Sequence, residues 1–415
     1  MEKNTINLAL FGFGHVGQGF YQTLPTNTKP IIEIVGIAVK NREKVRPFPD
    51  LPFIFNYQEL LQLDNIQLIV EATDDTDVAW EIIKTGLIRG IPVVSANKKL
   101  LATRFEEILR LSLKTGTPIF YEAAAAASIP IFQTIDQYYR YEKIEAISGI
   151  VNGTTNFILA GMTERGARFE DMLAEAQEKG FAESNPTSDI DAWDAAYKAV
   201  LLAAHAYGDI LNPNDIIRYG IRYINTDDIE YARKLNKKIR LIFQAKKEKD
   251  RLSITVLPTL VDSESAFYAV SDAYNAIKLN LTYSGEQLLT GKGAGSLPTG
   301  ATMVKNVLQA LENKPVDTTK KKFLATLPHK PALEIELLLR LPKGYTTEHW
   351  PKLELTNRIE GENHDRIQVW VHGEALIKYL PEWHELQFSL IATGKTRLVD
   401  DYKKTLVASI EDVKA

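Results

Sequence analysis

The chain has 415 residues, a formal net charge of −4 and no cysteine. This length is sufficient for two or three domains, and the absence of cysteine excludes disulfides, thiolate zinc sites and a cysteine nucleophile. A weakly acidic chain lacks the basic surface that nucleic acids require, so we expect no nucleic-acid partner. No apolar run reaches the roughly 20 residues of a membrane span, and no signal-peptide pattern is visible, so we expect a cytoplasmic protein without a membrane partner.

Residues 5 to 120 alternate between short apolar runs and helical patterns. Helices are predicted over Val78–Arg89 and Leu100–Thr115. The predicted strands are Ile6–Phe11, Ile32–Val39, Leu68–Glu71, Pro92–Ser95 and Ile119–Tyr121. Strands that alternate with helices are typical of a doubly wound parallel sheet of the α/β class.

Residues 128 to 300 have a different pattern, which favours an α+β domain. Its predicted strands are Ile144–Val151, Leu252–Leu260 and Ala266–Leu279, and its predicted helices are Phe169–Lys179, Ala192–Ala206 and Ala232–Ala245. The polar residues 313–322 are typical of a linker. The tail has β-like segments at Ala332–Leu341, Arg366–His372 and Leu386–Thr393. We therefore expect domains over 1–128 (with a returning segment near 300–312) and 129–299, then a small strand-rich module of unknown role over 323–415.

A glycine fingerprint follows the first predicted strand: Gly12-x-Gly14-x-x-Gly17. In such a turn the first glycine permits the bend, the second lets the backbone approach a pyrophosphate, and the third allows close helix–strand packing. The strand before it and the helix after it are the context that the fingerprint requires. The sequence therefore predicts a dinucleotide bound by Gly12, Phe13, Gly14, His15, Val16 and Gly17.

The end of the second strand indicates which dinucleotide is preferred. An Asp or Glu about 20 residues after the glycines would hold the ribose hydroxyls of NAD. This chain has Lys40 and Arg42 there instead, and cations suit the 2′-phosphate of NADP. We therefore expect NADP to be preferred over NAD, with solvated loop cations as the alternative.

Polar residues follow two further strands at their carboxyl ends, where open α/β sheets bind their ligands. Thr73 lies two residues after Glu71, Ser95 ends the next strand, and Asn97 follows at its carboxyl end. These side chains are candidates for cofactor contacts, and Lys98 is a candidate for contact with the substrate or the nicotinamide.

Carboxylates gather in a short stretch, GFAESNPTSDIDAWDAAYK, over residues 180–198. Asp194 and Lys198 are four residues apart and share a helix face, so they can pair. A lysine held by a carboxylate beside Glu183 and Asp189 can bind a polar substrate and manage a proton. The alternative is a solvated helix end with a surface ion pair.

Taken together, these segments resemble homoserine dehydrogenase over roughly residues 5 to 312. The matching stretches are GFGHVGQG (12–19), VVSANKKLLA (93–102), YEAAAAASIPI (121–131), ISGIVNGTTNFIL (147–159), AEAQEKGFAESNPTSDIDAWDAAYK (174–198) and, more weakly, GKGAGSLPTGA (291–301). The resemblance implies a Rossmann domain, a substrate and dimerisation domain and a homodimer. It also implies reversible NAD(P)H-dependent reduction of L-aspartate 4-semialdehyde to L-homoserine, which feeds threonine and methionine synthesis.

The resemblance also implies residue roles. Lys198 matches the catalytic lysine, Asp194 its partner, and Lys98 a second active-site lysine. Glu183 and Asp189 match carboxylates that bind the substrate's ammonium group. Further matches are a substrate loop at Asn152, Gly153 and Thr154, a cofactor contact at Gly295, and a sodium-binding segment at Glu122, Ala125 and Ala127, whose ligands are largely backbone carbonyls.

The chain departs from the family pattern at several positions. Alanines 123–127 replace a loop that is usually glycine-rich, Lys292 stands where proline is usual, and Ala192 stands where glycine is usual. The tail lacks the D-x-P-G pattern of the amino-acid-binding ACT domain. The alanine segment and Lys292 leave open a non-catalytic NADP-binding homologue that acts as a sensor. A phosphorylating semialdehyde dehydrogenase is excluded, because it needs a thiol nucleophile.

Overall fold

The computed structural model describes residues 5–248, 251–312, 331, 333–350 and 352–398. The expected linker 313–322 lies outside the described residues, as do 323–330 and 399–415 of the expected C-terminal module. The chain forms two compact units, and each is described by itself. The described parts of the first unit are 5–141, 204–210 and 291–312, and those of the second are 142–203, 211–248, 251–290, 331, 333–350 and 352–398.

A six-stranded sheet in the order β3-β2-β1-β4-β5-β6 is the centre of the first unit, and every neighbouring pair in it is parallel. The strands are β1 (Thr5–Phe11), β2 (Ile31–Ala38), β3 (Phe53–Ile54), β4 (Leu68–Glu71), β5 (Val93–Ser95) and β6 (Ile119–Phe120). This sheet confirms the expected α/β class and doubly wound arrangement.

Two longer helices between these strands begin at side-chain caps. Asp75 accepts from the backbone N–H groups of Asp77 and Val78 to start α3 (Thr76–Ile88). Asn97 accepts from the N–H of Leu100 to start α4 (Lys98–Thr115). The remaining short helices of this unit are α2 (Tyr57–Leu61), α5 (Ala123–Ala126) and α6 (Ile131–Gln133), which runs into a π-helical turn at Thr134–Tyr138.

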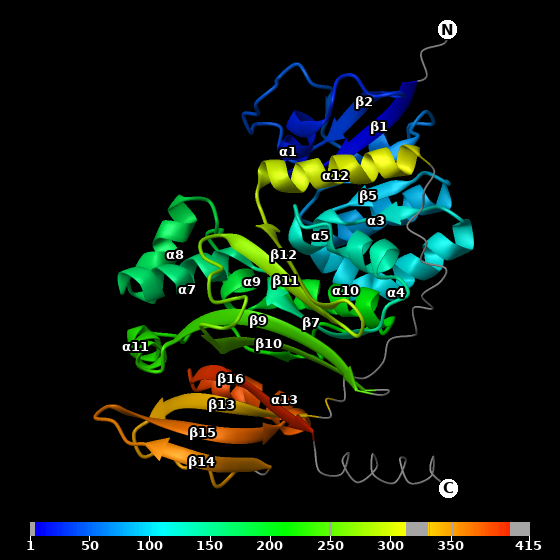
Figure 1. The fold of residues 1–415 in the computed structure, drawn as a ribbon. Coiled ribbons are helices and arrows are strands. Elements are labelled where there is room, and N and C mark those ends of the chain that lie inside the picture. The colour runs from blue at the N-terminus through cyan, green and yellow to red at the C-terminus, as the bar shows by residue number, and fades with distance from the viewer. Residues whose placement is uncertain (1–4, 249–250, 313–330, 332, 351, 399–415) are drawn as a thin grey trace, which may run out of the picture. The chain divides into compact units, whose positions relative to one another are not determined.

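The chain returns to the first unit with α12 (Ser296–Leu311), which packs against α1 (His15–Thr23), as Figure 1 shows. The two helices meet at glycines. A Cβ on Gly19 would lie 1.9 Å from the carbonyl oxygen of Ser296, and one on Gly300 would lie 2.2 Å from the backbone of Gly19. Neither position has room for a side chain, so the approach of the two backbones requires glycine at both.

The second unit is built on a mixed sheet in the order β12-β11-β7-β9-β10-β16-β13-β15-β14. Its first strands are β7 (Ile144–Ile150), β8 (Ile217–Arg218), β9 (Lys237–Glu248), β10 (Arg251–Asp262), β11 (Tyr274–Leu281) and β12 (Gly285–Lys292). Its helices are α7 (Gly153–Arg165), α8 (Phe169–Glu178), α9 (Thr187–Ile190), α10 (Trp193–Tyr207, whose last residues belong to the first unit) and α11 (Thr226–Lys234).

Two predictions for this region are wrong. The segment Ala232–Ala245 is not one helix, because α11 ends at Lys234, Asn236 has a left-handed backbone, and β9 follows. Pairing of β9 with β10 along its whole length overrides the helical appearance of the sequence. The predicted strand Ala266–Leu279 begins only at Tyr274, since turns occupy the residues before it.

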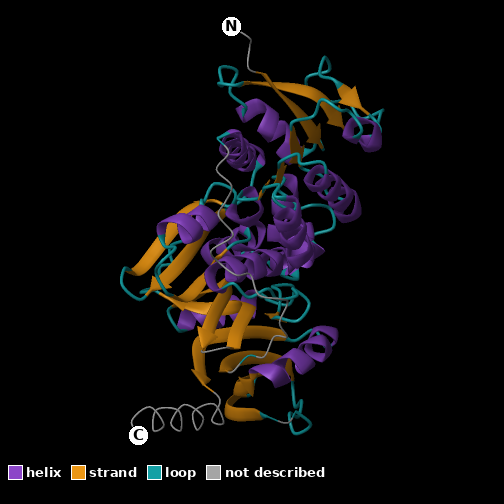
Figure 2. Cartoon of the chain, turned by 90° about the vertical axis from the view of Figure 1, so that its right-hand side faces the viewer, coloured by secondary structure: helices purple, strands orange, loops and turns teal. Residues whose placement is uncertain are grey.

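The tail adds β13 (Leu333–Pro342), β14 (Leu353–Ile359), β15 (His364–His372), α13 (Gly373–Glu385) and β16 (Ser389–Leu398). We call the described residues 333–350 and 352–398 the C-terminal module. Figure 2 shows α13 against the strands of this module. Neither α13 nor β14 of the module was predicted from the sequence. The core of the module is continuous with Ile217, Tyr219 and Leu257 of the same unit, and β16 pairs with β10.

Candidate active site

The glycine turn after β1 has the geometry of an anion site. Gly12 has φ 94°, and a Cβ there would lie 2.4 Å from the carbonyl oxygen of Ala72, so only glycine fits. A Cβ on Gly17 would lie 2.2 Å from the carbonyl oxygen of Gly12. A Cβ on Gly14 would meet nothing within 4 Å, and Gly14 begins α1 without a side-chain cap or an acidic residue in its first turn. The open space at this uncapped helix N-terminus fits a pyrophosphate.

The other residues of the turn take different places. Phe13 is buried and packs edge-on against Tyr21 and Phe53, so only its backbone is placed to line the turn. His15 is exposed and Val16 is half-buried. Gly295, with φ 118°, precedes α12, and the hydroxyl of Ser296 donates to the carbonyl oxygen of His15 at 2.6 Å. The N-termini of α1 and α12 therefore lie beside each other.

The candidate phosphate-binding cations lie on the surface after β2. Lys40 Nζ is 2.9 Å from Asp75 Oδ2, and this hydrogen bond raises the pKa of Lys40 and lowers that of Asp75. The guanidinium of Arg42 lies over the ring of Phe55, 4.9 Å from its centroid. Lys40 is thus held by a carboxylate, while Arg42 is supported by an aromatic face.

Glu71 organises the strand ends beside the turn, a role that was not predicted from the sequence. Its buried carboxylate accepts from the backbone N–H of Thr73 at 2.8 Å and the hydroxyl of Thr73 at 2.7 Å, and from the hydroxyl of Ser95 at 2.5 Å. Asn97 donates to the carbonyl oxygen of Thr73 at 3.1 Å. Burial raises the pKa of Glu71, and these hydrogen bonds oppose the rise. The candidate residues Thr73, Ser95 and Asn97 thus form one network.

Lys98 is the first residue of α4 and is half-buried at the carboxyl end of β5, whereas Lys99 beside it is exposed. The difference in burial distinguishes the two neighbouring lysines. It agrees with the placement of ligands at strand ends in open α/β sheets.

The alanine segment after Glu122 forms a helical turn, α5, rather than a loop. The buried carboxylate of Glu122 accepts from the N–H groups of Phe132 at 2.8 Å and Gln133 at 3.0 Å, and burial raises its pKa to about 7. Ala127 adopts a positive φ of 44°, and its carbonyl oxygen accepts from Thr302 at 2.8 Å. Among the described residues, no group of three His, Cys, Asp or Glu side chains could hold a metal ion, so a cation here would depend on backbone oxygens.

A buried cluster joins the other candidates within the second unit. Asn152 caps α7, and its amide nitrogen donates to Asp189 Oδ1 at 2.7 Å and to Asp194 Oδ2 at 2.9 Å. Lys198 Nζ lies 2.8 Å from Asp194 Oδ2 and donates to the carbonyl oxygen of Val151 at 2.7 Å. Asn152 is therefore connected, through hydrogen bonds and the ion pair, with Asp189, Asp194 and the ammonium group of Lys198. The carbonyl of Val151 is a member that the sequence did not indicate.

The remaining candidates lie around this cluster. Thr154 donates from its hydroxyl to the carbonyl oxygen of Phe181 at 2.6 Å. Gly153 lies against the backbone of Ala273, where a Cβ would be 2.9 Å from the carbonyl oxygen. Glu183 is exposed. The first two residues thus shape the start of α7, and the side chain of Glu183 does not belong to the buried network.

The buried imidazole of His205 was assigned no functional role from the sequence. His205 lies between Asp136, with Nδ1 2.5 Å from Oδ2, and Tyr121, with Nε2 3.2 Å from the hydroxyl. Phe132 stacks on the imidazole at 4.0 Å between ring centroids. This arrangement fixes the end of α10 within the first unit.

Comparison with known proteins gives consistent results. Residues 130–308 match the family model "Homoserine dehydrogenase", and residues 12–122 match "Homoserine dehydrogenase, NAD binding domain". Homoserine dehydrogenase of Neisseria gonorrhoeae is 33% identical over 76% of this chain and 74% of its own length.

Solved structures give the same family. A homoserine dehydrogenase from Thiobacillus denitrificans superposes with a TM-score of 0.81 at 28% identity, over 94% of this chain and 98% of that one. A hyperthermophilic archaeal homoserine dehydrogenase in complex with NADPH has a TM-score of 0.66 at 26% identity, over 75% of this chain and 99% of that one. No helix of the described residues is long and apolar enough to cross a membrane.

Proposed function

The chain belongs to the homoserine dehydrogenase family, and we propose how its residues divide the work of the family's reaction. That reaction is the reversible NAD(P)H-dependent reduction of L-aspartate 4-semialdehyde to L-homoserine, in threonine and methionine biosynthesis. The observation that supports our assignment most strongly is the buried ion pair of Lys198 with Asp194, joined to Asn152 and Asp189.

Lys198 is the proposed acid. When bound, the nicotinamide supplies the hydride in one direction and accepts it in the other. Reduction of the aldehyde leaves negative charge on the substrate oxygen, which needs a proton or a fixed cation. Lys198 meets this need, because Asp194 favours its ammonium form and Val151 and Asp194 together fix its direction. In the reverse direction the same amine takes the hydroxyl proton of homoserine.

The substrate's amino-acid end requires groups of its own. Asp189 and Glu183 are proposed to bind the α-ammonium group, because carboxylates form charge-assisted hydrogen bonds with it. The start of α7, with Asn152, Gly153 and Thr154, is proposed to hold the substrate, since helix N-termini favour carboxylates. Lys98 is the proposed second lysine near the reacting carbon.

The cofactor residues are proposed from the first unit. The N-terminus of α1 would hold the pyrophosphate, with Gly295 beside it and Thr73, Ser95 and Asn97 toward the nicotinamide. We propose a preference for NADP over NAD on the basis of the cationic side chains of Lys40 and Arg42. A monovalent cation such as Na⁺ at Glu122, Ala125 and Ala127 belongs to the proposal as well.

The larger organisation is proposed on the same basis. Residues 1–128 with 300–312 would bind the dinucleotide, and residues 129–299 would bind the substrate and form a homodimer, with 313–322 a linker and 323–415 a small module. The proposed partner is a small-molecule substrate, without a nucleic acid or a membrane. The proposed location is the cytoplasm.

Replacement of Lys198 by glutamine tests the assignment. We expect homoserine-dependent reduction of NADP at alkaline pH to fall by about 100-fold or more in kcat, the range of general acid–base catalysis. NADPH binding, followed by fluorescence titration, should stay within twofold. The control is Lys99→Gln on the exposed neighbour of Lys98, which should leave both quantities unchanged. Unchanged turnover in Lys198→Gln would refute the assignment of Lys198. Measurement of wild-type turnover with and without Na⁺ or K⁺ tests the proposed cation site.

A further inference from the structure

Asp191 lies in the middle of the carboxylate segment, which we define as residues 183–198. It is only 8% exposed, and its two carboxylate oxygens accept from Nε and Nη2 of Arg222, each at 2.8 Å. This two-point geometry is the strong form of an arginine–carboxylate pair. Asp191 is therefore occupied by a partner and acts as an attachment point of the segment.

The backbone next to Asp191 is held by the same neighbour. Residues 217–223, here called the bridging segment, supply Arg218, which donates to the carbonyl oxygen of Asp191, and Ile221, whose N–H donates to the carbonyl oxygen of Ile190 at 2.7 Å. A Cβ on Gly220 would lie 2.0 Å from that oxygen of Ile190. The two segments are thus in direct backbone contact.

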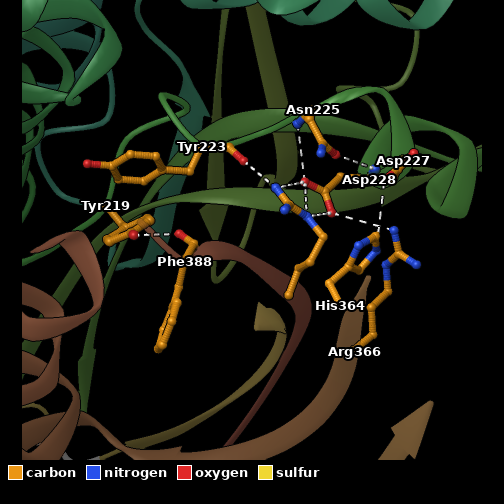
Figure 3. Close-up of polar contacts among 9 residues, drawn as sticks. Tyr219, Tyr223, Asn225, Asp227, Asp228, His364, Arg366 and Phe388 are labelled. Atoms are coloured by element: carbon orange, nitrogen blue, oxygen red, sulfur yellow. Dashed lines mark hydrogen bonds and ion pairs between the residues drawn. The ribbon is translucent and has the colours of Figure 1, made fainter. Parts of the chain in front are cut away.

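The other side of the bridging segment is held by the C-terminal module. Figure 3 shows the hydroxyl of Tyr219 directed at the carbonyl of Phe388, to which it donates at 2.6 Å, and it is 3.1 Å from the carbonyl oxygen of Trp383. Arg340 donates to the carbonyl oxygen of Tyr223 at 2.8 Å and binds Asp228. Since Tyr219 is buried in the core of the module, the bridging segment cannot shift independently of it.

One side chain of the module reaches the carboxylate segment itself. His384 of α13 has Nε2 3.8 Å from Asp191 Oδ1 and Nδ1 3.4 Å from the hydroxyl of Tyr223. Its ring packs edge-on against Tyr223, with 5.2 Å between the centroids. Arg222 and His384 therefore approach the same carboxylate from two parts of the chain.

The carboxylate segment needs such support at this point. Ala192, the next residue, has φ 63° and is fully buried, so the turn between α9 and α10 uses a backbone conformation that disfavours alanine. Asp189 and Asp194 lie on the two sides of this turn. A change in the backbone conformation of this turn would move both carboxylates relative to Asn152.

We propose that Arg222 and His384 are positioning residues for the protein carboxylates Asp189 and Asp194 at the substrate site. The C-terminal module sets the placement of these two carboxylates through the bridging segment. This inference rests on the proposed function, because it assumes that Asp189 and Asp194 serve homoserine. According to this inference, the C-terminal module supports substrate binding although the module itself binds no ligand.

The test uses the full chain and steady-state kinetics with homoserine and NADP. Arg222→Gln should raise KM for homoserine about tenfold, since small errors of placement are costly, with KM for NADP within twofold of wild type. Arg222→Lys keeps the charge but loses the two-point geometry, and should recover part of the loss. His384→Ala should raise KM for homoserine about threefold, because the His384 side chain is 45% exposed and its 3.8 Å contact with Asp191 is therefore weaker.

Two further variants separate positioning from folding. Arg358→Gln breaks the pair with Asp365 inside the module, away from the bridging segment, and should leave KM for homoserine unchanged. The double variant Asp191→Asn/Arg222→Gln removes both charges of the Asp191–Arg222 pair together, and should show the raised KM at a melting temperature close to that of wild type.

The outcomes distinguish the inference from the function. Wild-type turnover together with a normal KM for homoserine in the double variant would overturn the positioning role and leave the proposed function intact. An equal rise in Arg358→Gln would overturn it too, since any damage to the module would then suffice. A wild-type chain without homoserine-dependent turnover would overturn both.

Discussion

Lys198 and Asp194 form an ion pair of 2.8 Å in which the side chains are only 7% and 3% exposed. An exposed pair with this helical spacing contributes only about 0.3–0.5 kcal/mol to stability. Burial makes the loss of one member of the pair more costly, because each charge is removed from water and is stabilised mainly by its partner. The pair is therefore sensitive to any change in either member.

Asp194→Asn should consequently lower both stability and activity. Removing one charge of a buried pair typically costs about 3–5 kcal/mol, so we expect the melting temperature to fall by several degrees. Scanning calorimetry and kcat with homoserine measure the two effects. Asp171→Asn, on the exposed face of α8, is the matched control and should change neither. Wild-type stability in Asp194→Asn would show that the pair contributes little.

Ala192→Gly should stabilise the protein. Left-handed backbone costs a non-glycine residue roughly 1–2 kcal/mol, whereas loss of the buried methyl group costs about 0.8 kcal/mol. The net change should therefore be a small rise in melting temperature. The same substitution at Ala195, inside α10, should have the opposite sign, because glycine in a helix interior is unfavourable by about 1 kcal/mol. A fall of similar size in both variants would contradict the strain at Ala192.

Glu71 should make stability depend on pH. Its folded pKa is raised by burial, so its contribution is fully present below the ordinary glutamate pKa of about 4.5 and is lost as the pH rises through the raised value. The free energy of unfolding of Glu71→Gln should therefore change less between pH 4.5 and 8 than that of wild type. Urea denaturation across this range is the measurement. Glu33→Gln, on the exposed side of β2, should keep the wild-type slope, and an equal slope in Glu71→Gln would contradict the prediction.

The sequence predicts the first unit better than the second for a physical reason. The parallel strands there are short apolar runs, and β4 and β5 are followed by the helix caps Asp75 and Asn97, so the local signals agree with the fold. In the second unit, Lys237–Glu248 contains apolar residues that suit a helix as well as a strand. Only pairing with β10, which is a long-range contact, decides between them.

The candidate site shows the same limit. Asp194 and Lys198 share a helix, and their spacing predicts the pair that the structure contains. The partners Val151 and Arg222 were not predicted, because a backbone carbonyl and an arginine far along the chain carry no local signal. Glu71 could have been suspected, since a carboxylate that ends a buried strand needs hydrogen-bond donors.

Asp75→Asn should strengthen the preference for NADP. Asp75 now holds Lys40 at 2.9 Å and places a negative charge near the proposed site of the 2′-phosphate. Asparagine caps helices about as well as aspartate, so α3 should keep its start while Lys40 becomes available to the phosphate. We expect KM for NADP to fall by a few-fold, the effect of one exposed charge pair, with KM for NAD unchanged.

Arg42→Ala is the opposing variant and should raise KM for NADP by about tenfold, since a charge-assisted hydrogen bond to the phosphate is lost. Lys84→Ala, exposed on α3, is the control for a general loss of positive charge. Because NAD lacks the phosphate, both site variants should act on NADP alone. Equal changes with NAD and NADP would show that these side chains contact a part common to both cofactors, and would contradict the assignment of Lys40 and Arg42 to the 2′-phosphate.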